Sequence, residues 1–259
     1  MHHIPFSRLI IHLAGEMKIA LIGYGKMGKA IESVALTRNH TVVLKITADN
    51  LQELTIQNLQ LADVAIEFSQ PDAAYGNVMK CFGAGIPVVC GTTGWNKLAD
   101  DAKKICREKN QTFFLAPNFS IGVNIFFALS EQMAKLASRF PQYDHISIKE
   151  IHHTQKKDAP SGTAVSLAND MVKNISRLKT WKSYEGEQAH DDASSLPVYS
   201  YRTGEVAGIH EVNYSSEDDF ITLKHEAKGR SGFAKGAVTA AEWVQGKKGV
   251  FDMKDLLEL

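Results

Sequence analysis

The sequence predicts an α/β protein in which a Rossmann-type dinucleotide-binding domain is joined to a second, α+β domain. Three observations carry this prediction. A glycine-rich loop follows a short apolar strand near the N-terminus, strand and helix patterns alternate up to residue 118, and strand patterns follow one another directly after residue 197. Alternation implies a parallel sheet covered on both faces, whereas successive strands imply an antiparallel or mixed sheet. The length of 259 residues is enough for about one to two domains.

Short apolar runs typical of buried strands define the first domain. They lie at residues 18–22, 42–46, 64–68, 88–90 and 112–115. Apolar residues recur at helical spacing between Met27 and Ala35, and residues 97–109 also have a helical pattern. We therefore expect strands and helices that alternate along residues 17–118 and form a parallel sheet.

The pattern changes near residue 119. A long helix is expected over about residues 123–139, then an alternating strand at residues 145–151, then a helix with an apolar face from Ala164 to Ile175. Residues 176–197 are polar and predict a loop with some irregular structure. Three strands and a last helix follow, at residues 198–202, 207–214, 220–226 and 234–244. This succession predicts the second, α+β domain.

Composition excludes several classes of protein. Lys and Arg number 29, as do Asp and Glu, so the net charge of zero argues against a strongly basic nucleic-acid binder. No apolar run reaches the roughly 18 residues that span a bilayer, and residues 9–13 are too short for a typical signal peptide. Three scattered cysteines indicate neither a disulfide framework nor structural zinc. We expect a cytoplasmic protein without nucleic-acid or membrane partners.

The glycine-rich loop predicts a phosphate-binding turn. It matches G-x-G-x-x-G between a strand and a helix, and its residues are Gly23, Tyr24, Gly25, Lys26, Met27 and Gly28. The first glycine permits the tight turn, the second permits close approach of a pyrophosphate, and the third permits close packing of helix on strand. Free amides and the positive helix end then bind the phosphates. The alternative interpretation is an ordinary glycine turn.

The choice between NADH and NADPH stays open at the end of the second strand. An acidic residue about 20 positions after the loop binds the ribose hydroxyls in such domains. Asp49 could do so, but it lies two residues beyond the expected strand end. Thr47 is better placed and, being neutral, would not repel a 2′-phosphate. Lys45 could attract that phosphate, or it could be an ordinary solvated side chain.

Residues 150–163 join a strand to a helix and carry several groups suited to catalysis. His152 and Lys156 can both supply protons. Ser161 suits the start of the helix, where its amide and those of Gly162 and Thr163 would be free to bind an anion. A substrate carboxylate could lie between Lys156 and these amides. Taken singly, each residue could instead be a packed histidine, a solvated lysine or a simple helix cap.

No metal site is predicted in this segment. Adjacent residues His152 and His153 on a strand point to opposite faces, which argues against a shared ion. No carboxylate or cysteine is recognised at ligand spacing, so a metal-dependent hydrolase is disfavoured.

The segment resembles a signature of one enzyme family. Residues 150–163 match E-x-H-H-x-x-K-x-D-A-P-S-G-T in full. Further matches lie at residues 65–71, 91–94, 116–123 and 233–237. The chain from Met17 onward therefore resembles the dihydrodipicolinate reductases, also called 4-hydroxy-tetrahydrodipicolinate reductases, of lysine and diaminopimelate biosynthesis.

The resemblance implies that NADPH or NADH gives a hydride to a cyclic imine-type dicarboxylate, forming tetrahydrodipicolinate with loss of water. His152 falls at the position of the proton donor or acceptor, and Lys156 at that of a proton donor. The positions implied to bind substrate are His153, Gly162 and Thr163. The positions implied to bind the dinucleotide are those of the glycine loop together with Gly91, Thr92, Thr93, Ala116, Pro117, Asn118 and Phe119.

The resemblance also implies an organisation. Residues 17–119 and 231–259 would form the dinucleotide-binding domain, and residues 120–230 the substrate-binding domain, through whose sheet a homotetramer assembles. Residues 1–16 are an extension outside the family pattern.

Two further departures from the family pattern are Ile209, where the family usually has glutamate, and the neutral Thr47. Two alternatives remain. Within enzymes, the chain could be another two-domain NAD(P)-dependent reductase; from a different class, it could be a non-catalytic nucleotide sensor that kept the fold.

Overall fold

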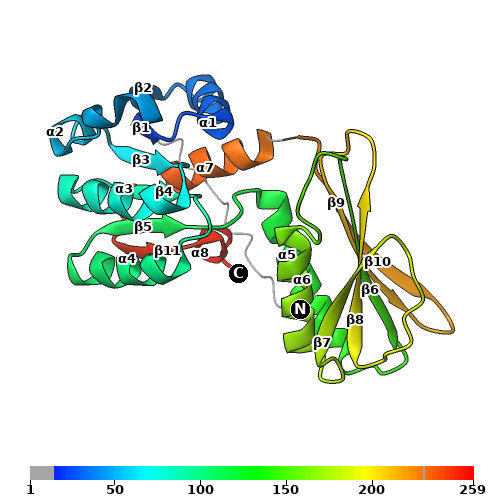
Figure 1. Cartoon of the computed structure of the whole chain (residues 1–259). Helices are drawn as coiled ribbons and strands as arrows, with labels where there is room; N and C mark the ends of the chain where they lie inside the picture. The colour runs from blue at the N-terminus through cyan, green and yellow to red at the C-terminus, as the bar shows by residue number, and fades with distance from the viewer. Residues whose placement is uncertain (1–14, 230) are drawn as a thin grey trace. The chain divides into compact units, whose positions relative to one another are not determined.

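The computed structural model describes residues 15–229 and 231–259. The chain forms two compact units (Figure 1). Unit 1 contains the chain up to Pro117 together with Ala234–Asp252, and unit 2 contains Asn118–Phe233 together with Met253–Leu259.

Unit 1 is built on a six-stranded parallel sheet with strand order β11-β5-β4-β3-β1-β2. The strands are β1 (Lys18–Ile22), β2 (Thr41–Ile46), β3 (Val64–Glu67), β4 (Val88–Cys90), β5 (Thr112–Leu115) and β11 (Gly249–Phe251). The residues of β3 and β4 are buried throughout, which explains their nearly continuous apolar sequence. The α/β class and the parallel sheet predicted from the sequence are confirmed.

Helices cover this sheet. They are α1 (Lys26–Thr37), α3 (Pro71–Ala84), α4 (Asn96–Glu108) and most of α7 (Ser231–Trp243), with short η1 (Ala48–Glu53) and α2 (Ile56–Leu59) after β2. Side chains of α3 and α4 pack with those of the strands in one apolar core. Arg38, just after α1, bonds Glu242 of α7 at 2.7 Å, so these two helices lie side by side.

Helix α3 has no counterpart among the elements expected from the sequence. Pro71 at its start and Gly85, with φ of 74°, at its end are ordinary helix boundaries. Its buried face includes the small Ala74 and the polar Asn77 as well as Val78. That mixture weakens the apolar stripe by which an amphipathic helix is recognised.

Unit 2 contains a five-stranded mixed sheet with strand order β10-β9-β6-β8-β7. The strands are β6 (His145–His152), β7 (Thr180–Glu185), β8 (Ser195–Arg202), β9 (Ile209–Ser215) and β10 (Phe220–Glu226). Strand β8 is parallel to β6 and β7, whereas β9 is antiparallel to β6 and β10. Burial alternates along β6 and β9, and the buried side packs with helices α5 (Ile121–Ala137) and α6 (Gly162–Asn174).

The loop expected at residues 176–197 is wrong in part. Strand β7 lies inside it, and β8 begins at Ser195. Strand β7 is an edge strand whose side chains are half-buried or exposed, and it carries Lys182 and Glu185. Charges on an edge strand discourage pairing with other chains, and they also give the segment the composition of a loop.

The C-terminus also departs from the expected domain assignment. Residues 231–259 were all expected in the dinucleotide-binding domain, but residues 231–233 and Met253–Leu259 cluster with unit 2, as do Asn118 and Phe119 from the expected segment 17–119. The last of these segments contains helix α8 (Met253–Leu257), where Lys254 lies 3.5 Å from Glu131 of α5. Contact with α5 accounts for the grouping of the last residues with unit 2.

The extension expected at residues 1–16 falls mostly outside the described residues. Met17, just before β1, is buried, and its amide donates to Nδ1 of His40 at 3.3 Å. Within the described part of the chain, every helix is too short or too polar to cross a membrane.

Candidate active site

The glycine loop in unit 1 has the backbone conformation that its sequence predicts. Gly23 has a φ of 93°, and a Cβ there would lie 2.0 Å from the carbonyl oxygen of Phe68. A Cβ on Gly28 would lie 2.4 Å from the carbonyl oxygen of Gly23, whereas a Cβ on Gly25 would meet nothing within 4 Å. The first and third glycines therefore permit the turn and its close packing. The second leaves the helix end open to a phosphate.

Side chains near the loop form a small network. Tyr24 donates its hydroxyl to Glu32, and Lys45 lies 2.5 Å from the other oxygen of Glu32. The bonds from Lys45 and Tyr24 lower the pKa of Glu32. Lys45 is thus already paired with a carboxylate. Its attraction for a 2′-phosphate is correspondingly weaker.

The two residues considered for the ribose lie at the start of η1. Thr47 accepts a hydrogen bond from the amide of Asp49 at 3.2 Å, so its hydroxyl caps the short helix. Asp49 is exposed in the first turn.

The loops after β3 and β4 are tied together by Glu67, the last residue of β3, which is fully buried. Thr92 donates to its Oε2 at 2.7 Å and accepts from the amide of Ser69 at 2.8 Å. The hydroxyl of Thr92 is thus occupied within the protein, whereas Thr93 is exposed. Gly91 lies against Phe68, whose ring atoms would be 2.2 Å from a Cβ at that position.

The last predicted dinucleotide segment crosses the boundary of the units. Ala116 and Pro117 belong to unit 1, and Asn118 and Phe119 to unit 2. Ala116 and Phe119 are buried, and Pro117 is exposed. Asn118 accepts from the amide of Ser120 at 2.8 Å, just before α5.

The predicted catalytic segment lies in unit 2, between the end of β6 and the start of α6. His152 is the last residue of β6 and is buried. His153 follows the strand and is half-buried, with its amide bonded to the carbonyl of Val206 at 2.8 Å. Ser161 caps α6 by accepting from the amide of Ala164 at 3.3 Å.

One expected anion-binding group is occupied. The amide of Ser161 donates to Oε1 of Glu150 at 3.1 Å, so the expectation that it is free to bind an anion is wrong. Gly162, in the first turn of α6, is exposed, and Thr163 is half-buried. The carboxylate of Glu150 competes for the first amide because it lies on the adjoining strand, two residues before His152.

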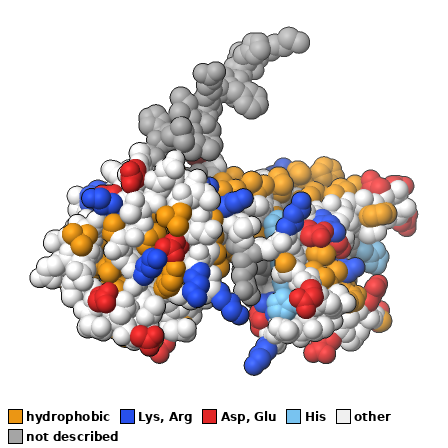
Figure 2. Space-filling model, turned by 90° about the horizontal axis from the view of Figure 1, so that it is seen from above, with side chains coloured by type: hydrophobic (Ala, Val, Ile, Leu, Met, Phe, Trp, Pro, Cys, Tyr) orange, Lys and Arg blue, Asp and Glu red, His pale blue; other side chains and the backbone are white. Residues whose placement is uncertain are grey.

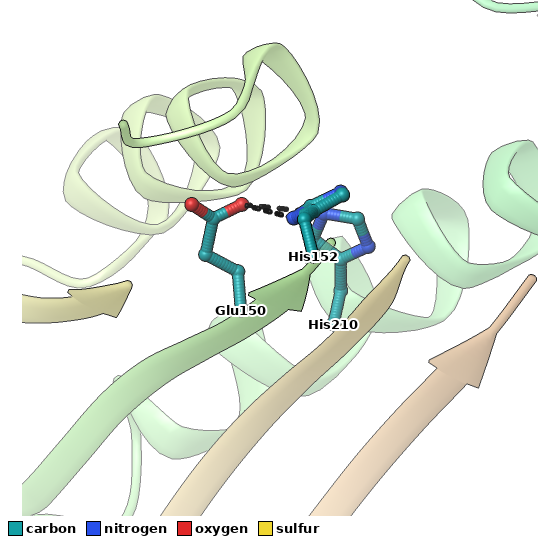
Figure 3. A group of neighbouring side chains, drawn as sticks. All are labelled: Glu150, His152 and His210. Atoms are coloured by element: carbon teal, nitrogen blue, oxygen red, sulfur yellow. Dashed lines mark ion pairs between the residues drawn. The ribbon is translucent and has the colours of Figure 1, made fainter. Parts of the chain in front are cut away.

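Glu150 is the centre of the site (Figure 3). It is fully buried, and its Oε1 also accepts from Arg202 at 2.9 Å. Its Oε2 lies 3.1 Å from Nδ1 of His152 and 3.9 Å from Nε2 of His210. Burial alone would raise the pKa of this carboxyl, but His152, Ser161 and Arg202 together hold the pKa well below its usual range. The carboxylate is therefore ionised at neutral pH.

His210 comes from β9 and stays neutral. Burial is the main cause that lowers its pKa to about 3, and the neighbouring His152 lowers it further. The two imidazole rings pack edge to face with centroids 5.1 Å apart. Nε2 of His210 lies 3.1 Å from the hydroxyl of Ser161.

One part of the sequence argument against a metal site, the missing carboxylate ligand, is wrong. Glu150, His152 and His210 bring three candidate ligand atoms within 4.8 Å of one another, so a carboxylate does lie at ligand spacing. The guanidinium of Arg202, however, is bonded to the same carboxylate. A fixed positive charge at that position repels a divalent cation and favours the ion pair.

Lys156 lies on the loop between β6 and α6. Its Nζ bonds both oxygens of Asp158, at 2.8 and 2.9 Å. Burial would raise the pKa of Asp158, but the bond from Lys156 lowers it overall. Arg202 holds the same loop by donating to the carbonyl oxygens of Lys156, at 3.3 Å, and Asp158, at 2.5 Å.

The structure therefore adds three residues to the site, namely Glu150, Arg202 and His210. The sequence carried a signal for Glu150, because alternation along β6 places it on the same buried face as His152. Arg202 and His210 had no such signal, since they reach the site through the pairing of β8 and β9 with β6.

A Rossmann-type glycine loop in one unit and a buried histidine–carboxylate pair with a nearby lysine in the other define a dinucleotide-dependent oxidoreductase. Comparison with known families agrees with this class. Residues 17–119 match the family model described as dihydrodipicolinate reductase, N-terminus, and residues 122–257 match the model of its C-terminus. The chain belongs to the dihydrodipicolinate reductase family, which confirms the resemblance, and it is an NAD(P)H-dependent oxidoreductase.

Two relatives are named 4-hydroxy-tetrahydrodipicolinate reductase. The protein of Christiangramia forsetii is 43% identical over 241 residues, which cover 93% of this chain and 98% of the relative. That of Neisseria gonorrhoeae is 34% identical over 231 residues, covering 88% and 84%. A dipicolinate-bound dihydrodipicolinate reductase from Paenisporosarcina sp. TG-14 has the same fold, with a TM-score of 0.75 and 21% identity over 93% of this chain and 99% of that one.

Proposed function

We propose that this chain reduces 4-hydroxy-tetrahydrodipicolinate to tetrahydrodipicolinate in lysine and diaminopimelate biosynthesis, with NADPH or NADH as the hydride source. The observation that carries the proposal is the complete residue 150–163 signature, folded so that His152 pairs with a buried carboxylate. The relatives that are similar over most of the chain carry the name of this activity.

The proposed proton donors are His152 and Lys156. Reduction adds one hydride and one proton across a double bond, and water leaves the hydroxylated substrate. The nicotinamide supplies the hydride when it is bound. The electron density that hydride addition creates on the substrate is neutralised by a nearby acid, a role that suits the cationic Lys156 or a protonated His152. Removing bulk water from such a site strengthens these interactions.

The proposed carboxylate site lies at the start of α6. The amides of Gly162 and Thr163 and the positive end of this 13-residue helix attract an anion. Lys156 and His153 add polar donors from the preceding loop. A flat dicarboxylate needs two such anion sites, and charge-assisted bonds orient it firmly. Since the amide of Ser161 already donates to Glu150, Ser161 serves the site as the cap of α6.

The proposed dinucleotide site lies on the loops after the parallel strands of unit 1. It comprises the glycine loop, residues 91–93 and residues 116–119, with Asp49 as the candidate for the adenosine ribose. The open surface at Gly25 supports this assignment. Ligands of open α/β sheets bind outside the carboxyl ends of the strands, where these loops lie.

We further propose a cytoplasmic homotetramer without nucleic-acid or membrane partners. One face of the unit 2 sheet packs against α5 and α6, while the other carries the half-buried Ile151, Tyr199 and Tyr201, which a second copy would cover. All three cysteines are free, as expected in a reducing compartment. Figure 2 shows basic and acidic side chains interspersed over the face it presents. Light scattering should give a mass about four times the 28.6 kDa of one chain.

A coupled assay tests the proposed reaction. The substrate is generated in place from pyruvate and aspartate semialdehyde by the preceding synthase, and nicotinamide absorbance is followed with NADH and NADPH in parallel. Synthase-dependent oxidation is expected, and the ratio of the two rates decides the question raised by Thr47 and Asp49. Protein that binds nucleotide but oxidises neither cofactor would instead be a sensor or a different reductase.

A further inference from the structure

We propose that Glu150 is a positioning residue that orients both proposed proton donors, His152 directly and Lys156 through Arg202. This inference rests on the catalytic roles proposed for His152 and Lys156. In the proposed reaction Glu150 touches neither substrate nor cofactor. It affects the rate only through the residues that it positions.

The first step is the convergence of four elements on one carboxylate. Glu150 lies on β6, and its Oε1 accepts from the amide of Ser161 at the start of α6 and from Arg202 at the end of β8. Its Oε2 faces His152 and, at a longer distance, His210 of β9. A buried charge is costly unless it is paired and hydrogen-bonded, so this carboxylate fixes the positions of the groups that satisfy it.

The second step concerns the imidazole of His152. An ionised carboxylate only accepts hydrogen bonds, so a nitrogen 3.1 Å from Oε2 is stabilised when it carries a proton. Nδ1 and Oε2 are both buried, and neither has a hydrogen-bond partner of good geometry among the described residues. At 3.1 Å, each atom is the nearest available partner for the other. Glu150 therefore selects the tautomer with the proton on Nδ1.

The third step follows for Nε2, the nitrogen left to exchange a proton. A Cβ at position 208 would lie 3.0 Å from this atom, but the residue is Gly208, with a φ of 155°. The glycine leaves this side of the ring without a side chain against it. Because His210 is neutral, it adds no competing positive charge beside His152.

The fourth step links the carboxylate to Lys156. One guanidinium, that of Arg202, bonds Oε1 of Glu150 and the carbonyl oxygens of Lys156 and Asp158. These carbonyls lie on either side of Lys157, so the guanidinium fixes the backbone of the loop that carries Lys156. Without the charge of Glu150, Arg202 loses the partner that holds it in this place.

The test compares Glu150→Gln with Glu211→Gln. Glu211 is a matched control because it lies on β9 in the same sheet and pairs with Lys149 and Lys224, at 4.0 and 3.8 Å. Both variants are examined with the synthase-coupled assay and with imidazole ¹⁵N NMR of His152, which reports the protonated ring nitrogen. The NMR readout does not depend on turnover, so it remains valid if the proposed reaction is wrong.

A positioned proton donor contributes about 10²- to 10⁴-fold to the rate. Because Glu150 acts only through such donors, we expect kcat of Glu150→Gln to fall by less, about 10- to 1,000-fold. The KM for nucleotide should not change. His152 should shift from the Nδ1–H tautomer to a mixture in the variant, and Glu211→Gln should match the wild type in every readout. A folded Glu150→Gln with wild-type kcat and an unchanged tautomer would overturn the proposal.

Arg202→Lys provides a second variant if Glu150→Gln does not fold. It keeps the positive charge but loses the forked geometry that joins Glu150 to the loop. A drop in kcat with the His152 tautomer preserved supports the link to Lys156. A folded Arg202→Lys with wild-type kcat would overturn that link.

Discussion

Each unit of this protein buries one glutamate completely near the end of a strand, and the two glutamates have different partners. Glu67 in unit 1 accepts hydrogen bonds from uncharged side chains, those of Ser69, Asn77, Cys90 and Thr92. Glu150 in unit 2 is held by a guanidinium and a backbone amide and faces two histidines. Both side chains have 0% relative exposure.

The difference in partners indicates a difference in role. Neutral donors can fix two loops around a carboxylate, but they have no proton to exchange near neutral pH. A histidine and an arginine couple the carboxylate to charge and to proton transfer. Glu67 therefore organises the loops assigned to the dinucleotide, whereas Glu150 organises the groups assigned to chemistry. Five substitutions or conditions test this difference in role.

The largest effect is expected from Lys156→Ala. Turnover should fall by about 10²- to 10⁴-fold because the proposed proton donor is removed, while nucleotide affinity stays nearly unchanged. The coupled assay and nucleotide fluorescence measure the two quantities. Lys157→Ala is the control, since Lys157 is exposed on the same loop. An equal loss of nucleotide affinity would mean that Lys156 has a structural or cofactor-binding role.

His152→Gln should lower turnover by about 10²-fold, because this substitution also removes a proposed proton donor. Its melting temperature should change far less, because glutamine can still fill much of the space and bond Glu150. Turnover per folded molecule and thermal unfolding are measured on the same samples. A collapsed melting temperature with normal turnover of the folded fraction would identify His152 as a packing residue.

Glu67→Gln should lower the free energy of unfolding by about 2–3 kcal/mol. The amide group that replaces one oxygen cannot accept, so buried donors on that side lose their acceptor. Urea unfolding measures the change, and Glu108→Gln, at an exposed position on α4, is the control. Wild-type stability in Glu67→Gln would show that the four donors find other partners.

Acid should destabilise unit 2 through His210. The folded-state pKa of about 3 lies below the ordinary value of 6.5, so between these values the unfolded chain binds a proton that the folded chain does not. Stability therefore falls as the pH drops below 6.5, by up to about 1.4 kcal/mol per pH unit for this group. Burial also lowers the pKa of His225, which acts in the same direction.

Urea unfolding between pH 7.5 and 5 measures this slope. His210→Gln should show a shallower slope than the wild type, and replacement of the exposed His145 by glutamine should leave the slope unchanged. A His210→Gln protein with the wild-type slope would mean that His210 is protonated in the folded state.

The smallest effect concerns the cysteines. Burial raises the pKa of the Cys90 thiol, and the neighbouring Glu67 raises it further, so the reactive thiolate is scarce. Cys81 and Cys106 are also buried, with raised pKa values. We expect a thiol reagent at pH 8 to label none of the three until denaturant is added. Rapid labelling of one thiol in the native protein would show that unit 1 opens locally.

Local periodicity made a large part of the fold predictable. The strand at β1, the glycine loop and the alternation of β6 are encoded within short segments, so their elements could be placed from sequence. Helix α3 was missed because its buried face mixes small and polar residues, and β7 because an edge strand has the composition of a loop.

The site was predictable to the extent that its residues lie in one segment. His152, Lys156, Gly162 and Thr163 are within twelve positions of one another in the sequence. Arg202 and His210 come from strands that flank β6 only because the order is β9-β6-β8, which no local pattern states. The occupation of the Ser161 amide by Glu150 likewise depends on how the turn between β6 and α6 folds back.

The most direct test asks whether Glu67 serves nucleotide binding while the Glu150 cluster serves chemistry. It compares the variants Glu67→Gln and His152→Gln. Nucleotide dissociation constants and single-turnover rates at saturating nucleotide are determined for both folded variants. We expect Glu67→Gln to weaken nucleotide binding while its saturated rate stays near that of the wild type, and His152→Gln to do the reverse. Equal losses of affinity and rate in both variants would contradict the division of roles between the two buried carboxylates.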